Sequence, residues 1–88
     1  VMIEASIAPH EAYGTPLTAA DVSEYATIAA RADQPVIVPT QKAIQPDEVR
    51  VLSDAGVAGV LIGAVVTGTE TASIADATAR FRQAVDST

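Results

Sequence analysis

The chain contains a single lysine, Lys42, and its position makes it a candidate for chemistry. All four arginines fall in segments that we expect to be helical, whereas Lys42 follows the apolar run of residues 36–38. Loops at the carboxyl ends of parallel strands are where α/β folds build their sites. Lys42 could therefore hold an anionic group, or serve as a base or Schiff-base amine if water is excluded. The alternative is a solvated loop lysine beside the acids of the next helix.

Glu4 and His10 are two further candidates, in and just after the first apolar segment. Alternation in a strand over residues 1–8 places Glu4 and Ser6 on one face and the aliphatic side chains on the other. The aliphatic side chains belong against helices, so we expect Glu4 to point to the other, inner side of the sheet. There it would pair with Lys42 or a ligand, because a buried carboxylate needs a partner. The alternative is that Glu4 points outward, to the side of the helices or to solvent. His10 is a candidate for proton transfer, or an ordinary exposed loop histidine.

The third apolar segment contributes a candidate anion-binding group. Its members Gly63, Ala64, Thr67 and Gly68 precede the last predicted helix, where backbone N–H groups and the helix dipole favour an anion. Alternatively, Gly63 only permits close packing and Gly68 only supplies a turn with positive φ. One histidine, no cysteine and no cluster of acids at ligand spacing argue against a metal site in this chain alone. No particular cofactor is indicated.

Composition narrows the class of protein. The 88 residues form one domain or part of one, and 49% hydrophobic residues exclude general disorder. A net charge of −6 argues against a nucleic-acid partner, and no apolar run is long enough to span a membrane. The lack of cysteine fits a cytoplasmic protein. Because the chain starts directly on an apolar strand, we expect a trimmed or fragmentary chain.

Three successive βα units account for the sequence, at about residues 1–33, 34–56 and 57–88. We expect strands at 1–8, 35–39 and 58–66, because apolar runs joined by a helix predict parallel neighbours in a sheet covered on both faces. Thr18 and Asp21 predict the first helix start, and Gly56 predicts the end of the second helix. The third helix is expected at 70–85. The expected buried stripes are Val22, Tyr25, Ala26, Ala29 and Ala32, then Val49, Leu52 and Ala55, then Ile74, Thr78, Phe81 and Val85.

Four segments from Pro35 onward carry a family resemblance: Pro35-Val-Ile-Val, Gln45-Pro-Asp-Glu-Val, Asp54-Ala-Gly-Val-Ala-Gly and Val60-Leu-Ile-Gly-Ala-Val-Val. In this order they resemble the last two βα units of phosphate-binding (βα)8 (TIM) barrels. The resemblance implies that residues 2–8 are the strand before them. Such barrels usually carry a glycine pair after the seventh strand. This chain has Pro39-Thr40-Gln41-Lys42 there, so a lysine would replace half of the phosphate site.

The resemblance implies the C-terminal part of a cytoplasmic TIM-barrel enzyme that acts on a small anionic metabolite. A phosphorylated metabolite is one option within this class. Lyase, isomerase or aldolase-like chemistry would fit such a parent. Three βα units are fewer than eight, so the partner would be the remainder of a barrel or further copies of the chain. The alternative is a non-catalytic truncated-barrel module that self-associates or pairs with another chain through its sheet edges.

Overall fold

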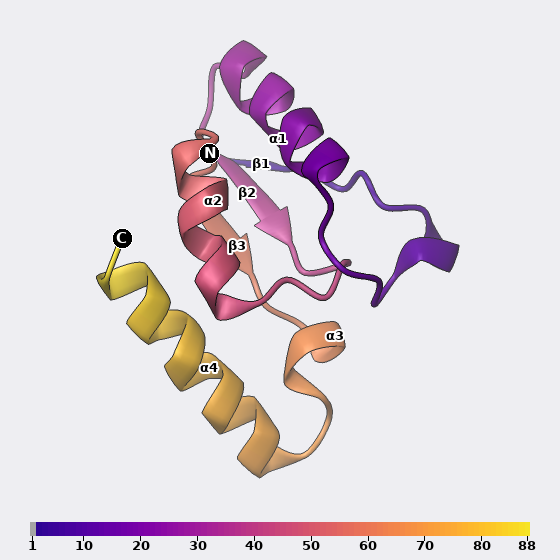
Figure 1. Ribbon diagram of the computed structural model, residues 1–88, viewed down its shortest axis with the longest axis vertical. Helices are drawn as coiled ribbons and strands as arrows, with labels where there is room; N and C mark the ends of the chain where they lie inside the picture. The colour runs from indigo at the N-terminus through magenta and orange to yellow at the C-terminus, as the bar shows by residue number, and fades with distance from the viewer. Residues whose placement is uncertain (1) are drawn as a thin grey trace.

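The computed structural model describes residues 2–88 and shows an α/β fold with one three-stranded parallel sheet (Figure 1). The strands lie in the order β1-β2-β3, which is also their order in the sequence. The main elements are β1 (Ile3–Glu4), α1 (Ala19–Arg31), β2 (Val36–Pro39), α2 (Val49–Asp54), β3 (Gly59–Leu61) and α4 (Thr71–Asp86). Three shorter helices complete the fold: η1 (His10–Ala12), η2 (Pro46–Glu48) and α3 (Ala64–Thr67). The predicted α/β class and the parallel strands are confirmed.

The helices α1, α2 and α4 pack on the same face of the sheet. One core cluster joins Tyr25 of α1, Leu52 of α2 and Phe81 of α4 to the strand residues Val36 and Val38. Since alternate residues of a strand share a face, Val36 and Val38 both point toward these helices. In Figure 1 the three helices follow one another from the top to the lower left. No helix of residues 2–88 joins the sheet from its other face in this cluster, so the expectation of cover on both faces is wrong for this chain.

The first helix begins where the sequence predicts. Thr18 is its N-cap and accepts a hydrogen bond from the Asp21 amide at 3.1 Å, while the Asp21 carboxylate accepts one from the Thr18 amide at 2.9 Å. This reciprocal capping box satisfies two amides that the helix start would otherwise leave unpaired. Of the predicted stripe, Tyr25 is fully buried and the others are half-buried. The predicted contact face of α1 is therefore confirmed.

Two strands are shorter than predicted. The first covers only Ile3–Glu4 instead of residues 1–8, and Val1 lies outside the described residues. The third ends at Leu61, and residues 64–67 form the short helix α3. The cause lies at Gly63, whose carbonyl accepts hydrogen bonds from the amides of Val66 and Thr67 and so turns the chain away from the sheet. An apolar β-branched run can thus be helical when its amides find acceptors in a preceding turn.

The face of α4 that meets the core also differs from the prediction. Ala77 and Phe81 are buried, whereas Ile74 and Val85 are 42% and 43% exposed. Alanine at 77 lets the helix approach the core closely, so the buried line follows residues 77, 81 and 84 rather than 74, 78 and 85. The larger side chains Ile74 and Val85 are left partly open to solvent.

We expect Gly56→Ala to lower the free energy of unfolding by about 2 kcal/mol. Gly56 ends α2 with φ of +101°, as the sequence predicts, and an added Cβ would lie 3.3 Å from the Ala29 Cβ of α1. Gly14 is the matched control, because its φ is +82° and an added Cβ meets nothing within 4 Å. Gly14→Ala should cost only the backbone strain of about 1 kcal/mol. Equal losses in urea unfolding would show that the contact with α1 contributes nothing.

Candidate functional site

Gln41 follows the carboxyl end of β2 and links polar groups from the loops at the carboxyl ends of the strands. Its Nε2 donates hydrogen bonds to Ser6 Oγ and to Tyr13 Oη, both at 3.0 Å. Its Oε1 accepts from the Ala8 amide at 3.3 Å. The Ala8 N–H can only donate, so it fixes which end of the carboxamide faces which neighbour. The Gln41 carbonyl also accepts from the Gly14 amide at 2.8 Å, which ties the loop after β1 to the loop after β2.

Thr40 performs a similar task between β2 and β3. Its hydroxyl donates to the Leu61 carbonyl at 3.2 Å and accepts from the Gly63 amide at 2.8 Å. The residue is buried, at 5% exposure, so these bonds replace the water that its hydroxyl would otherwise need. The two strand ends are therefore held together by a side chain as well as by the sheet.

A hollow of about 260 Å³ lies at the carboxyl ends of β2 and β3. Its lining combines the ends of β2 and β3 with the start of α3 and one side chain of the loop after β1: Tyr13, Pro39, Thr40, Gln41, Leu61, Ile62, Gly63, Ala64 and Val65. None of these nine residues is charged. We call it the carboxyl-edge hollow. Its position agrees with the rule that α/β folds bind ligands at the carboxyl ends of their strands.

Lys42 is buried and forms an ion pair with Asp21 of α1, with 3.2 Å between Nζ and Oδ2. The predicted partner Glu4 is therefore wrong, and so is the alternative of a solvated loop lysine. Residues 40–42 follow β2 as a turn, in which the Gln41 side chain reaches Ser6 and Tyr13 while the Lys42 side chain reaches Asp21 of α1. Lys42 does not line the carboxyl-edge hollow. In this arrangement it anchors the start of α1.

Burial, hydrogen bonding and the charge of Lys42 all act on the pKa of the Asp21 carboxylate. Burial raises its pKa, but hydrogen bonding to Thr18 and the ammonium of Lys42 outweigh that effect, so the pKa lies below its ordinary value of 3.8. One turn further along α1, burial raises the pKa of the Tyr25 hydroxyl, and the charges of Asp21 and Glu24 add to the rise. Asp21 therefore remains ionised as the partner of Lys42 at neutral pH.

Glu4 and His10 lie near the site edge without meeting Lys42. Glu4 is exposed and accepts a hydrogen bond from Ser6 Oγ at 3.4 Å. Glu4 pairs in register with Ile37 and alternates with the buried Ala5, so it lies on the predicted face, away from the helices, but without the predicted ion pair. The His10 ring lies 5.1 Å from the Tyr13 ring, centroid to centroid. Neither Glu4 nor His10 lines the carboxyl-edge hollow, so the three candidate catalytic residues are not brought together.

The candidate anion-binding amides are largely engaged within the chain. The Gly63 amide donates to Thr40 Oγ1, the Thr67 amide to the Gly63 carbonyl and the Gly68 amide to the Ala64 carbonyl. Gly68 has a φ of +69° and ends α3. Of the four residues, Gly63 and Ala64 line the carboxyl-edge hollow, whereas Thr67 and Gly68 do not. An anion bound by the amides of Gly63, Thr67 and Gly68 would have to break these bonds.

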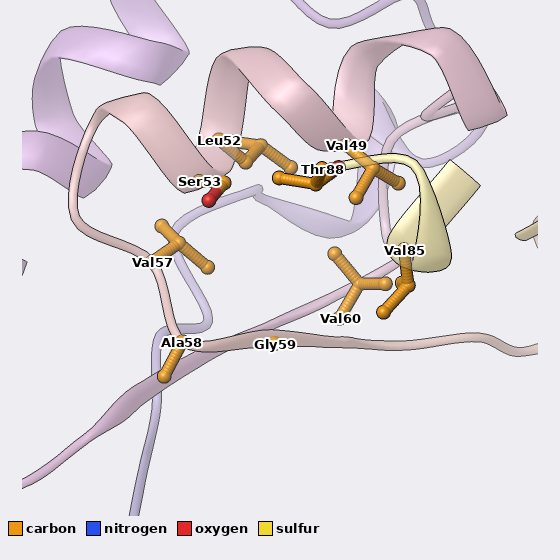
Figure 2. A pocket seen from close by; sticks show the side chains of 9 residues that line it. All are labelled: Val49, Leu52, Ser53, Val57, Ala58, Gly59, Val60, Val85 and Thr88. Carbon is orange, nitrogen blue, oxygen red and sulfur yellow. The ribbon is translucent and has the colours of Figure 1, made fainter. Parts of the chain in front are cut away.

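A second hollow, of about 300 Å³, lies at the opposite end of β3 (Figure 2). Figure 2 shows Leu52 and Val49 of α2 facing Val60 of β3 across this space, with Val85 from the end of α4 beside it. Ser53 and Thr88 supply the only hydroxyl groups among its lining residues. None of the residues proposed for chemistry lines it. We interpret it as a packing gap between α2, β3 and α4.

Comparison with known protein families, with curated proteins and with solved structures gives no match for the chain. The site therefore rests on its own geometry. Within residues 2–88 no group of three histidine, cysteine or acidic side chains is arranged to hold a metal ion. The helices described here are also too short or too polar for one of them to cross a membrane.

Sequence reasoning missed Tyr13 and Gln41 as site residues. Tyr13 stands in the loop after β1 and Gln41 in the loop after β2, so their positions at strand ends were a usable signal. Lys42, one residue beyond Gln41, drew attention because of its charge.

Proposed function

We propose that this chain is an arc of a (βα)8-type barrel within a cytoplasmic metabolic enzyme. The observation that supports the proposal is the parallel order β1-β2-β3 together with α1, α2 and α4 on one face. Doubly wound sheets reverse their strand order and carry helices on both faces. Barrels keep the order of the sequence and place every helix outside. An arc of three βα units has the second arrangement.

The uncovered face supports the same proposal. Leu61 alternates with Val60, which faces α2 (Figure 2), so the Leu61 side chain lies on the side away from the helices. Leu61 is 50% exposed there, which leaves a large apolar side chain in need of cover. In a closed barrel this face is the packed interior, filled by side chains from the remaining strands.

The carboxyl-edge hollow is where we propose that the enzyme holds part of a small metabolite. The anionic, phosphorylated substrate and the lyase, isomerase or aldolase-like reaction suggested by the sequence remain proposals for the whole enzyme. Lys42 is held by Asp21, and no charged side chain lines the hollow. Positive charge for such a substrate would therefore come from the remaining strands.

The second candidate is a non-catalytic module that self-associates through its sheet edges. Two features favour it: the edges of β1 and β3, which are unpaired within residues 2–88, and the exposed Leu61. Both proposals require a further strand beside β3. They differ in whether that strand comes from another part of a barrel or from a second copy of this module.

Hydrogen exchange at β3 tests the shared requirement. The Thr40 amide donates to the Leu61 carbonyl, and the N–H and C=O of a strand residue point to the same side, so the Leu61 amide faces β2 and the Val60 amide faces the free edge. In the native protein we expect Val60 to exchange as slowly as Leu61, because a neighbouring strand binds its amide. Fast exchange at Val60 beside a protected Leu61 would contradict the barrel. Native mass spectrometry separates a closed barrel from a homo-oligomer of the module.

A further inference from the structure

We propose that the carboxyl-edge hollow binds the uncharged, carbonyl-bearing end of a small molecule, and that Tyr13 Oη donates a hydrogen bond to the carbonyl oxygen. The inference rests on the proposed function, which makes the carboxyl edge the ligand side of the sheet. It goes further by naming the donor and the chemical class of the group that enters the hollow.

The hydrogen bonds around Gln41 prepare Tyr13 to donate. The Ala8 amide holds Gln41 Oε1, so Nε2 faces the Tyr13 hydroxyl and donates to it at 3.0 Å. A phenol oxygen that accepts in this way still carries its own proton. Within residues 2–88 this proton has no acceptor, and the side chain is 44% exposed at the hollow. Tyr13 can therefore give its O–H to a ligand without losing a bond to the protein.

The lining of the hollow favours an uncharged group. Its walls are apolar at Pro39, Leu61, Ile62 and Val65, and none of its nine residues is charged. Lys42, the only lysine, is already paired with Asp21. Removing a carboxylate or phosphate from water without a cation is costly, whereas a carbonyl needs one donor.

The volume sets the size of the group. A hollow of about 260 Å³ exceeds the ~150 Å³ of an apolar cavity that accepts benzene, so a single ring with a short substituent fits. The Tyr13 hydroxyl then determines the orientation, because it is the one side-chain donor in the lining whose proton is free in the described part of the chain, and its partner Gln41 fixes its place. Apolar contact provides the attraction and one hydrogen bond provides the selection.

The experiment compares three probes of similar shape in the full protein: acetophenone, ethylbenzene and benzoate. Binding is followed by NMR through the methyl groups of Ile62 and Val65, which line the hollow. We expect acetophenone to bind about threefold to tenfold more tightly than ethylbenzene, as one hydrogen bond allows, and benzoate to bind most weakly. Tyr13→Phe keeps the ring and should make acetophenone and ethylbenzene equal, while leaving the affinity for ethylbenzene unchanged.

Each of the other outcomes would overturn one part of the proposal. Tighter binding of benzoate or of inorganic phosphate would overturn the uncharged class, and an acetophenone preference that survives Tyr13→Phe would overturn Tyr13 as the donor. If no probe binds while the Val60 amide exchanges slowly, this inference fails and the barrel stands. If the probes bind as expected while the Val60 amide exchanges fast, the barrel fails and the inference stands.

Discussion

Leu61→Asp is expected to lower the free energy of unfolding of the native protein by more than about 3 kcal/mol. Leu61 lies on the sheet face without helices and is 50% exposed in this chain alone. In a closed barrel the same side chain is buried among those of the remaining strands. An aspartate there would be an unpaired charge in an apolar interior. Urea unfolding of the native protein measures the loss, and sedimentation shows whether its assembly survives.

Val51→Asp is the matched control for this experiment. Val51 lies on α2 and is 47% exposed, so Val51 and Leu61 have similar exposure in this chain alone. The proposed barrel leaves the outer side of its helices in water, and Val51→Asp should change the stability by less than about 0.5 kcal/mol. Similar small effects of both substitutions would show that the Leu61 face remains in solvent, which would remove the support that this face gives to a barrel or an oligomer.

Local signals in the sequence predicted much of the fold. The Thr18 and Asp21 pair sets the start of α1 through bonds between residues three apart, and Gly56 ends α2 through its own backbone. The apolar run after Pro35 gives β2 its correct end at Pro39. Each of these features depends on neighbours in the chain, so residue types alone reveal it.

The site could be predicted only in its location. Whether Lys42 pairs with Glu4 or Asp21 depends on how the turn after β2 directs its side chain, and both acids are available in the sequence. The bond from Gln41 to Tyr13 joins residues 28 positions apart, and no local pattern encodes it. The helix α3 forms because the Gly63 carbonyl accepts two amides, although its sequence is β-branched and favours a strand. Tertiary contacts decide the first two of these features.

Lys42→Met is expected to lower the free energy of unfolding by about 2–3 kcal/mol at pH 7. Methionine retains the apolar stem but leaves the Asp21 carboxylate without its ammonium partner. The side chains of Lys42 and Asp21 are only 11% and 17% exposed, so water replaces the lost partner incompletely. The remaining access to water places the expected loss below the 3–5 kcal/mol typical of a fully buried pair.

The pH dependence separates this ion pair from a simple packing effect. Because the folded-state pKa of Asp21 lies below its ordinary value of 3.8, the carboxylate stabilises the fold above that pH, and this contribution is lost as the pH falls through the folded-state pKa. The difference between the native protein and Lys42→Met should therefore be complete at pH 7 and shrink below about pH 3.8. A packing effect would persist in acid.

Arg80→Met supplies the control for the Lys42 variant. Arg80 pairs with Asp76 at 3.1 Å, a distance close to that of the Lys42 pair, but its side chain is 59% exposed and that of Asp76 is 68% exposed. An exposed pair on one helix contributes about 0.3–0.5 kcal/mol, so this variant should be nearly neutral. Equal stability losses in the two variants would mean that burial adds nothing to the Lys42 pair. Lys42 would then be free to leave Asp21, and its predicted role with a ligand would regain support.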